Sequence, residues 1–196
     1  EFPFCLVAET AMRPEQRKIS ATDQLLAELR NELAAAMELI ERLDDAVFTQ
    51  PSGRNGSIGA HFRHNIELVK ALYDGVETGR IDYAARSRDK SVETDRSIAI
   101  RAFQTLIERG RGFALLEISA PLTVASETVP GLDIASSFGR ELEFAISHKV
   151  HHHALIAERL REMCVGIDPM FGVAAATRRF WETENKKNTT EKRERI

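Results

Sequence analysis

The sequence has few cysteines, no long apolar run and no motif of the common nucleotide-binding folds. Its 196 residues include two cysteines, Cys5 and Cys164, which form neither a CxxC pair nor a disulfide framework. This usage is typical of a reducing compartment, so we expect a cytoplasmic protein. No run of about 18 consecutive apolar residues occurs, which argues against a transmembrane helix and a membrane partner. The absence of GxSxG, GxxxxGK[ST] and GxGxxG disfavours α/β-hydrolase, P-loop and Rossmann chemistry.

The charge balance gives no indication of nucleic-acid binding. Lys and Arg total 27 against 30 Asp and Glu, for a formal net charge of −3. The basic residues do not gather on one predicted helix with interleaved aromatic residues, as nucleic-acid-binding proteins often require. The short basic loop at Arg86, Arg88 and Lys90 is interpreted as solvated surface. We therefore expect no nucleic-acid partner.

Apolar residues recur at spacings of three and four along much of the chain, and this spacing predicts amphipathic helices. The second of them begins after Ser57, a good N-cap, and stops at Gly79. The third has Glu93 and Asp95 in its first turn, where the helix dipole favours acids. The four helices are expected at residues 20–45, 57–78, 91–116 and 136–163.

The connection before the last helix differs in composition from the rest. Residues 121–134 are rich in β-branched side chains and partly alternating, so they are interpreted as an extended segment or a short hairpin. Residues 80–90 are interpreted as a polar connection. Together these features predict an all-α four-helix bundle with a long connection, including a short β element, before the last helix.

Both ends of the chain are predicted to lie outside the bundle. Residues 1–18 are interpreted as an N-terminal arm or strand rather than a signal peptide, because no basic segment precedes the apolar run. Residues 19–165 form the expected bundle, and residues 166–196 a C-terminal extension. The last part, residues 184–196, is charged and almost free of apolar residues, so it is predicted to be disordered.

The histidines are concentrated in two of the predicted helices. Four of the six fall within residues 148–153, and the other two are His61 and His64. Because helical positions i and i+4 share a face, His148 and His152 are expected to point the same way. Such a pair offers two imidazole nitrogens to one metal ion, and a third histidine from a facing helix would leave open positions for water. Ligand type alone does not choose among Zn²⁺, Ni²⁺, Fe²⁺ and Mn²⁺.

Other residues near these histidines have open roles. Glu141 and Glu67 are favoured as first-turn or surface acids over catalytic bases, and chance clustering of histidines remains a competing explanation. At least one residue of 151–153 has to face solvent or an interface, and His61 and His153 are the expected bystanders. The residues retained as alternative ligands or as partners of the ligands are His61, His151 and Glu141.

Two stretches of the chain resemble the DinB/YfiT-like superfamily of bacterial metal-dependent proteins. They are residues 57–83, SIGAHFRHNIELVKALYDGVETGRIDY, and residues 139–160, GRELEFAISHKVHHHALIAERL. The resemblance extends over roughly residues 20 to 165. It implies a four-helix bundle that binds a divalent metal through one histidine of the second helix and an HxxxH pair of the fourth. On this pattern the ligands would be His64, His148 and His152, with His61 the main rival to His64.

Three kinds of function are compatible with this pattern. In the first, the three histidines hold a metal ion for an enzyme with a small-molecule substrate, and the superfamily implies a small-thiol S-transferase or a metal-dependent hydrolase. In the second, the bundle binds a metal or small ligand without catalysis. In the third, the histidines are not ligands and the bundle dimerises, because a homodimer is the commonest symmetric assembly.

Overall fold

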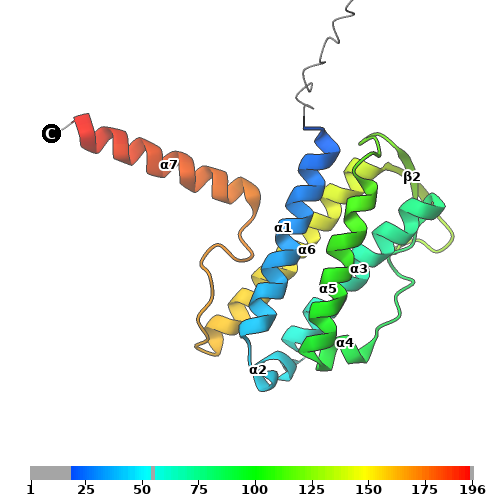
Figure 1. Ribbon diagram of the computed structural model, residues 1–196, viewed down its shortest axis with the longest axis horizontal. Coiled ribbons are helices and arrows are strands. Elements are labelled where there is room, and N and C mark those ends of the chain that lie inside the picture. The colour runs from blue at the N-terminus through cyan, green and yellow to red at the C-terminus, as the bar shows by residue number, and fades with distance from the viewer. Residues whose placement is uncertain (1–18, 54–55, 195–196) are drawn as a thin grey trace, which may run out of the picture.

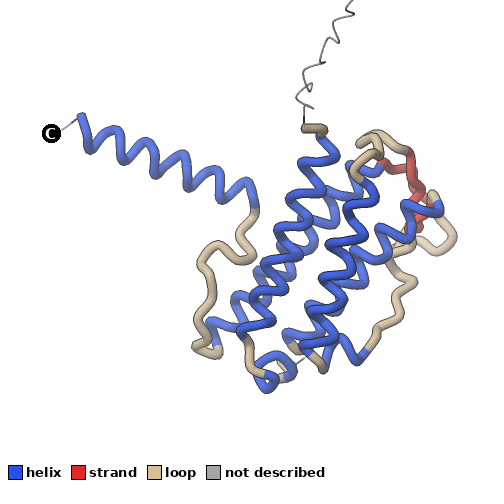
Figure 2. Tube along the Cα trace, viewed as in Figure 1, coloured by secondary structure: helices blue, strands red, loops and turns tan. Residues whose placement is uncertain are grey.

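The computed structural model describes residues 19–53 and 56–194, and the predicted N-terminal arm with Cys5 lies outside these ranges. The chain is mostly helical and carries one small three-stranded sheet (Figure 2). In chain order the elements are α1 (Ala21–Arg42), α2 (Asp45–Thr49), α3 (Ile58–Thr78), β1 (Arg80–Ile81), α4 (Lys90–Thr94), α5 (Arg96–Gly110), a 3₁₀ turn (Arg111–Phe113), β2 (Pro121–Ala125), β3 (Asp133–Ser137), α6 (Phe138–Glu162) and α7 (Ala175–Glu194).

The helices α1, α3, α5 and α6 pack against one another and form the four long helices of the core (Figure 1). α1 contacts both α5 and α6, and α3 contacts the same two helices. The apolar stripe predicted for the first helix is the buried face of α1, which includes Leu29, Leu33 and Ile40. Across the core, the rings of Phe62 on α3 and Phe103 on α5 meet edge to face with centroids 5.9 Å apart. Burial of this apolar surface is the main stabilising contribution to the fold.

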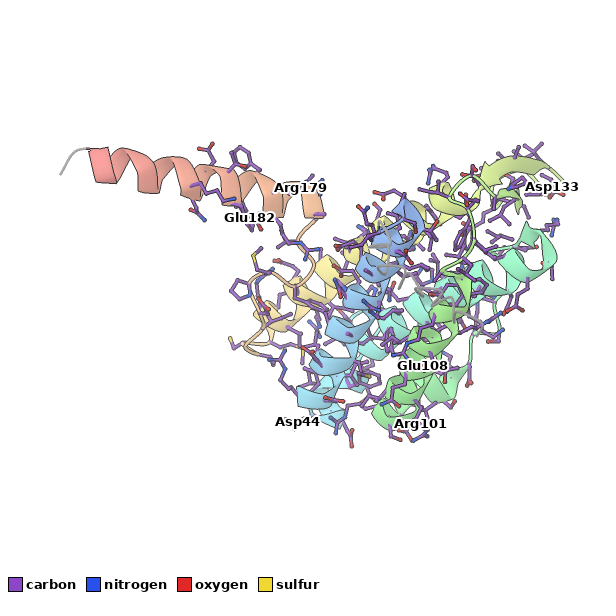
Figure 3. All side chains as sticks on the ribbon, turned by 45° about the horizontal axis from the view of Figure 1, so that its top comes forward. Asp44, Arg101, Glu108, Asp133, Arg179 and Glu182 are labelled. Carbon is purple, nitrogen blue, oxygen red and sulfur yellow. The ribbon has the colours of Figure 1, made fainter. Side chains whose placement is uncertain are left out.

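The outward faces of the helices carry the charge. Figure 3 shows Arg101 and Glu108 on α5 pointing away from the neighbouring helices, and both are exposed. No described helix combines the length and the apolar character that crossing a bilayer requires.

The ends of α3 agree with the sequence prediction. Ser57 is the N-cap, and its hydroxyl accepts a hydrogen bond from the backbone N–H of Ala60 at 3.0 Å. Gly79 follows the last turn with a φ of 81°, a left-handed conformation that glycine adopts without steric cost. Because α3 begins at Ile58, His61 and His64 lie near its N-terminal end.

The predicted third helix is two helices in the structure. α4 and α5 are separated at Asp95, whose backbone is extended, with φ −126° and ψ 111°. Its carboxylate accepts hydrogen bonds from the backbone N–H groups of Ser97 and Ile98, so it caps α5 instead of continuing α4. Aspartate competes for backbone donors in this way, and the sequence prediction treated it only as a favourable first-turn charge.

The β element before α6 is a hairpin, one of the two predicted alternatives. β2 and β3 pair antiparallel, with Thr123 opposite Ala135. The prediction missed β1, which pairs parallel with β2 and follows α3 directly. Because β1 has only two residues, it cannot show the alternation of apolar and polar side chains that indicates a strand. Arg80 on β1 donates a hydrogen bond to the Asp133 carboxylate on β3 at 2.9 Å. Figure 3 labels Asp133 at the end of the molecule that carries the sheet.

Residues 184–194, for which disorder was predicted, belong to helix α7 in the structure, and residues 195–196 lie outside the described ranges. α7 continues to Glu194 and extends away from the four long helices (Figure 1). Lys, Arg and Glu have good helix propensity, so the charged composition excluded a buried core but not a helix. The segment before α7 packs against the hydrophobic core through Phe171, which is buried. At the start of α7, Arg178 donates to the Glu32 carboxylate on α1 at 2.9 Å.

Candidate metal centre

His64 on α3 meets His148 and His152 on α6. One ring nitrogen from each residue lies within 4.8 Å of the other two. Nε2 of His64 is 2.8 Å from Nε2 of His148, and the ring centroids of His64 and His152 are 4.4 Å apart. All three side chains are half-buried. Within residues 19–53 and 56–194, no second group of three or more histidines, cysteines or acids is similarly arranged.

The packing of α3 against α6 aligns these rings. α3 buries Phe62 and Ile66, and α6 buries Ala145 and Ile156, which fixes the rotation of each helix about its axis. Residues four apart on α6 then project from one face, one turn above the other, as the HxxxH spacing predicted. The two clusters that the sequence separates are therefore brought together by the helix pair.

Burial keeps the three imidazoles neutral. It lowers the pKa of His64 to about 4, helped by the positive charge of Arg86 and by His148. Burial likewise lowers the pKa of His152 to about 3, with further contributions from the surrounding histidines. The pKa of His148 is also lowered by burial and by His151, while the exposed Glu127 partly opposes this. Metal ions bind neutral imidazole, so at neutral pH protonation of the rings does not compete with metal binding.

The donor set fits a divalent transition-metal ion. With Zn–N distances of about 2.0–2.1 Å, two ligands of a tetrahedral site have nitrogens roughly 3.4 Å apart. The 2.8 Å separation of His64 and His148, and the 4.8 Å span of the whole group, lie on either side of that value. Imidazole nitrogen suits Zn²⁺, Ni²⁺ and Fe²⁺, whereas Mn²⁺ is better served by oxygen ligands. Three protein ligands also leave a coordination position open.

Arg86 reaches the site from the connection between β1 and α4. Its Nη1 donates to Nδ1 of His64 over 2.5 Å. The side chain is half-buried, and its Nε is buried without a hydrogen-bond partner. The interpretation of this basic loop as solvated surface is therefore wrong for Arg86. A contact between residues 22 positions apart leaves no local pattern from which it could have been predicted.

Glu67 anchors the connection that carries Arg86. It is buried, and its carboxylate accepts from Nη1 of Arg63 at 3.2 Å and from the backbone N–H of Asp89 at 3.1 Å. The hydroxyl of Ser87 adds a longer contact of 3.4 Å. Glu67 is thus not the surface acid that the sequence favoured. Its role is to fasten residues 87–89 to α3.

The alternative ligands His61 and His151 lie beside the three-histidine group. Nδ1 of His61 is 2.9 Å from Nδ1 of His152, so one of these two nitrogens donates to the other. His151 is exposed, and its ring centroid lies 5.4 Å from that of His152. His61 therefore contacts a candidate ligand directly, whereas His151 covers the group from the solvent side.

Glu141, the third alternative, has other partners. It is buried, and it accepts from the hydroxyl of Tyr83 at 2.8 Å and from that of Ser136 at 2.5 Å. The ring of Tyr83 contacts Phe144, whose ring in turn contacts His148. Glu141 thus positions Tyr83 beside Phe144 and is not part of the three-histidine group.

His153, which was predicted to be a bystander of the metal site, points into the core. Its Nδ1 lies 3.0 Å from the Glu32 carboxylate, and its ring stacks on Phe171 with centroids 4.5 Å apart. Of the three consecutive histidines, His151 is the one that faces solvent. The neighbouring Lys149 is fully buried, and its Nζ lies over the ring of Phe103 at 4.9 Å. No local pattern in the chain indicates that this lysine would be enclosed.

Comparison of the chain with protein-family models, with curated proteins and with solved structures finds no match.

Proposed function

We propose that this protein binds one divalent metal ion through His64, His148 and His152 and uses it to act on a small-molecule substrate. The observation that carries the proposal is the convergence of three neutral imidazoles from two packed helices. Three-nitrogen sites of this kind, with a position left for a further ligand, are typical of catalytic zinc centres.

The bound ion would supply Lewis-acid chemistry, polarising an oxygen or sulfur atom of the substrate. The chain's own residues prepare the surroundings. The Phe144 ring lies against His148, with centroids 5.5 Å apart, and excludes water from that side. Nδ1 of His61 orients the His152 ring. Small-thiol S-transfer and hydrolysis, the two reactions implied by the sequence resemblance, both use this arrangement.

The same proposal places the chain in the DinB/YfiT-like superfamily, with α1, α3, α5 and α6 as a four-helix bundle. The packing of each of these helices against two others supports the bundle. The hairpin of β2 and β3 occupies the long connection before the last of the four, as the resemblance implies. On the sequence resemblance, the three histidines would correspond to the family's metal ligands.

A non-catalytic role is the second candidate, and one observation favours it. The ring nitrogens already pair among themselves, His64 with His148 and His61 with His152. A histidine network of this kind could hold α3 and α6 together, in a single chain or in a homodimer, without an ion. This candidate predicts that replacing a histidine lowers stability and leaves metal affinity unchanged.

A competitive titration with Zn²⁺ and a chromogenic chelator separates the two candidates. Wild-type protein is expected to bind about one equivalent, and His64→Ala to bind at least about 100-fold more weakly because one of three ligands is lost. His151→Ala, which alters an exposed neighbour, is the matched control and should retain wild-type affinity. Equal affinity of all three proteins would favour the non-catalytic network. If the metal site holds, the zinc-loaded protein is then assayed for thiol transfer and hydrolysis.

A further inference from the structure

Arg86 is a guanidinium without an acidic partner. Among the described residues the Arg86 side chain makes no ion pair, and its one hydrogen bond is the Nη1 contact with Nδ1 of His64. By contrast, Arg63, which immediately precedes His64, is paired with both Glu67 and Glu93. Arginine stays charged at every physiological pH, so a half-buried guanidinium without an anion is energetically unfavourable.

The backbone holds Arg86 at the site despite this cost. Glu67 accepts from Ser87 and from the backbone of Asp89, the residues that follow Arg86 closely in the chain. The connection is therefore fastened to α3 at a point that directs Arg86 toward His64. Its Nε is buried without a partner, and its Nη2 makes no hydrogen bond to the described residues. The Nε–Nη2 edge is the edge that guanidinium groups use to bind a carboxylate through two parallel bonds.

The contact with His64 is incompatible with a metal ion on the same ring. Arginine can only donate, so Nδ1 of His64 accepts, and in the neutral ring the proton then resides on Nε2. A metal ion on Nε2 needs the other tautomer, in which Nδ1 carries the proton and seeks an acceptor. Nη1 of Arg86 and the protonated Nδ1 of His64, which are both hydrogen-bond donors, would then face each other. Loading the site therefore releases Nη1 of Arg86 and leaves the whole guanidinium available.

The charges at the metal-loaded site also support the binding of an anion. Histidine ligands are neutral when they bind a metal ion, so three of them do not offset the charge of a divalent ion, and Arg86 adds a further positive charge. Glu127, in the β2–β3 turn, is exposed and makes no hydrogen bond to the histidines. The loaded site consequently favours an anionic ligand.

We propose that Arg86 is the substrate-anchoring residue of this centre and binds the carboxylate of a small organic acid beside the metal ion. This inference rests on the proposed metal site. It narrows the substrate class to molecules that carry a carboxylate within reach of the reacting atom. The two donors on the Nε–Nη2 edge of Arg86 would fix the orientation of the carboxylate. The metal ion would polarise the neighbouring functional group of the substrate.

The test uses Co²⁺-loaded protein, whose visible absorption spectrum reports on ligands near the ion, titrated with acetate in a buffer free of carboxylates. Wild type should give a saturable spectral change, and Arg86→Gln should bind acetate at least about tenfold more weakly while retaining one Co²⁺. Arg88→Gln, an exposed arginine two positions away, is the matched control and should behave as wild type. Inorganic phosphate is titrated in parallel.

The outcomes separate the two proposals. Equal acetate affinity of Arg86→Gln and wild type, with Co²⁺ bound in both, would overturn the role of Arg86 and leave the metal site intact. Tighter binding of phosphate than of acetate, lost in Arg86→Gln, would overturn the carboxylate assignment. Failure of wild type to bind Co²⁺ would overturn the proposed function itself.

Discussion

Nε2 of His64 lies 2.8 Å from Nε2 of His148, although 84 positions separate the two residues in the chain. The contact joins α3 to α6 at a half-buried position where both rings have lowered pKa values. Two buried imidazoles at this distance share one proton between them or bind a common ion.

His61 is expected to tune the site without being a ligand. Because its Nδ1 contacts Nδ1 of His152, His61→Ala removes the group that orients that ring. We expect Zn²⁺ affinity to fall by about 10–100-fold, with one ion still bound per chain. The chelator titration measures both quantities. Loss of stoichiometric binding in His61→Ala, together with normal binding in His64→Ala, would make His61 the ligand on α3.

Metal affinity should depend weakly on pH between about pH 8 and pH 6. Because the pKa values of His64 and His152 are lowered to about 4 and about 3, protons do not compete with the ion in this range. Histidines with ordinary pKa values would begin to lose affinity below about pH 6.5. The Zn²⁺ affinity is measured at four pH values, in buffers that do not bind zinc. A steady loss of affinity already between pH 7 and pH 6 would contradict the burial argument.

Lys149 should lower the free energy of unfolding at neutral pH. Its Nζ is fully buried without a hydrogen bond, and burial lowers its pKa from 10.5 to about 7. The unfolded chain therefore holds a proton that the folded chain releases, so stability should rise as pH increases from about 7 to about 10. In the metal-free protein, Lys149→Met should abolish this rise and stabilise the fold at pH 7 by about 1–4 kcal/mol.

Urea unfolding of the metal-free protein at three pH values tests the role of Lys149. Lys90→Met is the control, since Lys90 is exposed and its replacement should leave the pH dependence unchanged. A Lys149→Met protein that is less stable than wild type at pH 7 would mean that the ammonium has a favourable partner, such as a buried water or anion.

Arg178 should connect the C-terminal extension to α1 through Glu32. Burial raises the pKa of Glu32, but its hydrogen bonds with His153 and Arg178 outweigh this, and the net shift is downward. Arg178→Ala leaves the Glu32 carboxylate with His153 alone, and should destabilise the protein by about 0.5–1.5 kcal/mol because Arg178 is partly exposed.

The control for Arg178 is its neighbour Arg179, which is exposed on α7 (Figure 3). Thermal unfolding of Arg178→Ala and Arg179→Ala is compared with that of wild type. Equal melting temperatures for both variants would show that the Glu32 contact contributes nothing measurable.

Local chemistry was sufficient to predict the helices that carry the site. Ser57 and Gly79 bound α3 because one caps backbone donors and the other tolerates a left-handed φ, and both effects are visible in a few letters. The HxxxH spacing predicted that His148 and His152 share a face for a similarly local reason. Interactions within one or two turns thus carried most of the correct predictions.

Contacts between distant segments could not be predicted in this way. The partner of His153 is Glu32, 121 positions earlier, and the contact of Arg86 with His64 depends on how a connection folds back over α3. Asp95 was misread because a carboxylate near a helix start serves equally well as a first-turn charge or as a cap. Two-residue β1 exists only because β2 lies beside it.

The central claim is that the three histidines hold an ion, and elemental analysis of the full chain purified without a histidine tag or chelator tests it most directly. We predict about one divalent transition-metal ion per chain in wild type and almost none in His148→Ala/His152→Ala, with the helical circular dichroism of both proteins unchanged. Absence of metal from folded wild type, and no uptake of added Zn²⁺, Ni²⁺, Mn²⁺ or anaerobic Fe²⁺, would contradict the claim and leave the histidines as a packing network between α3 and α6.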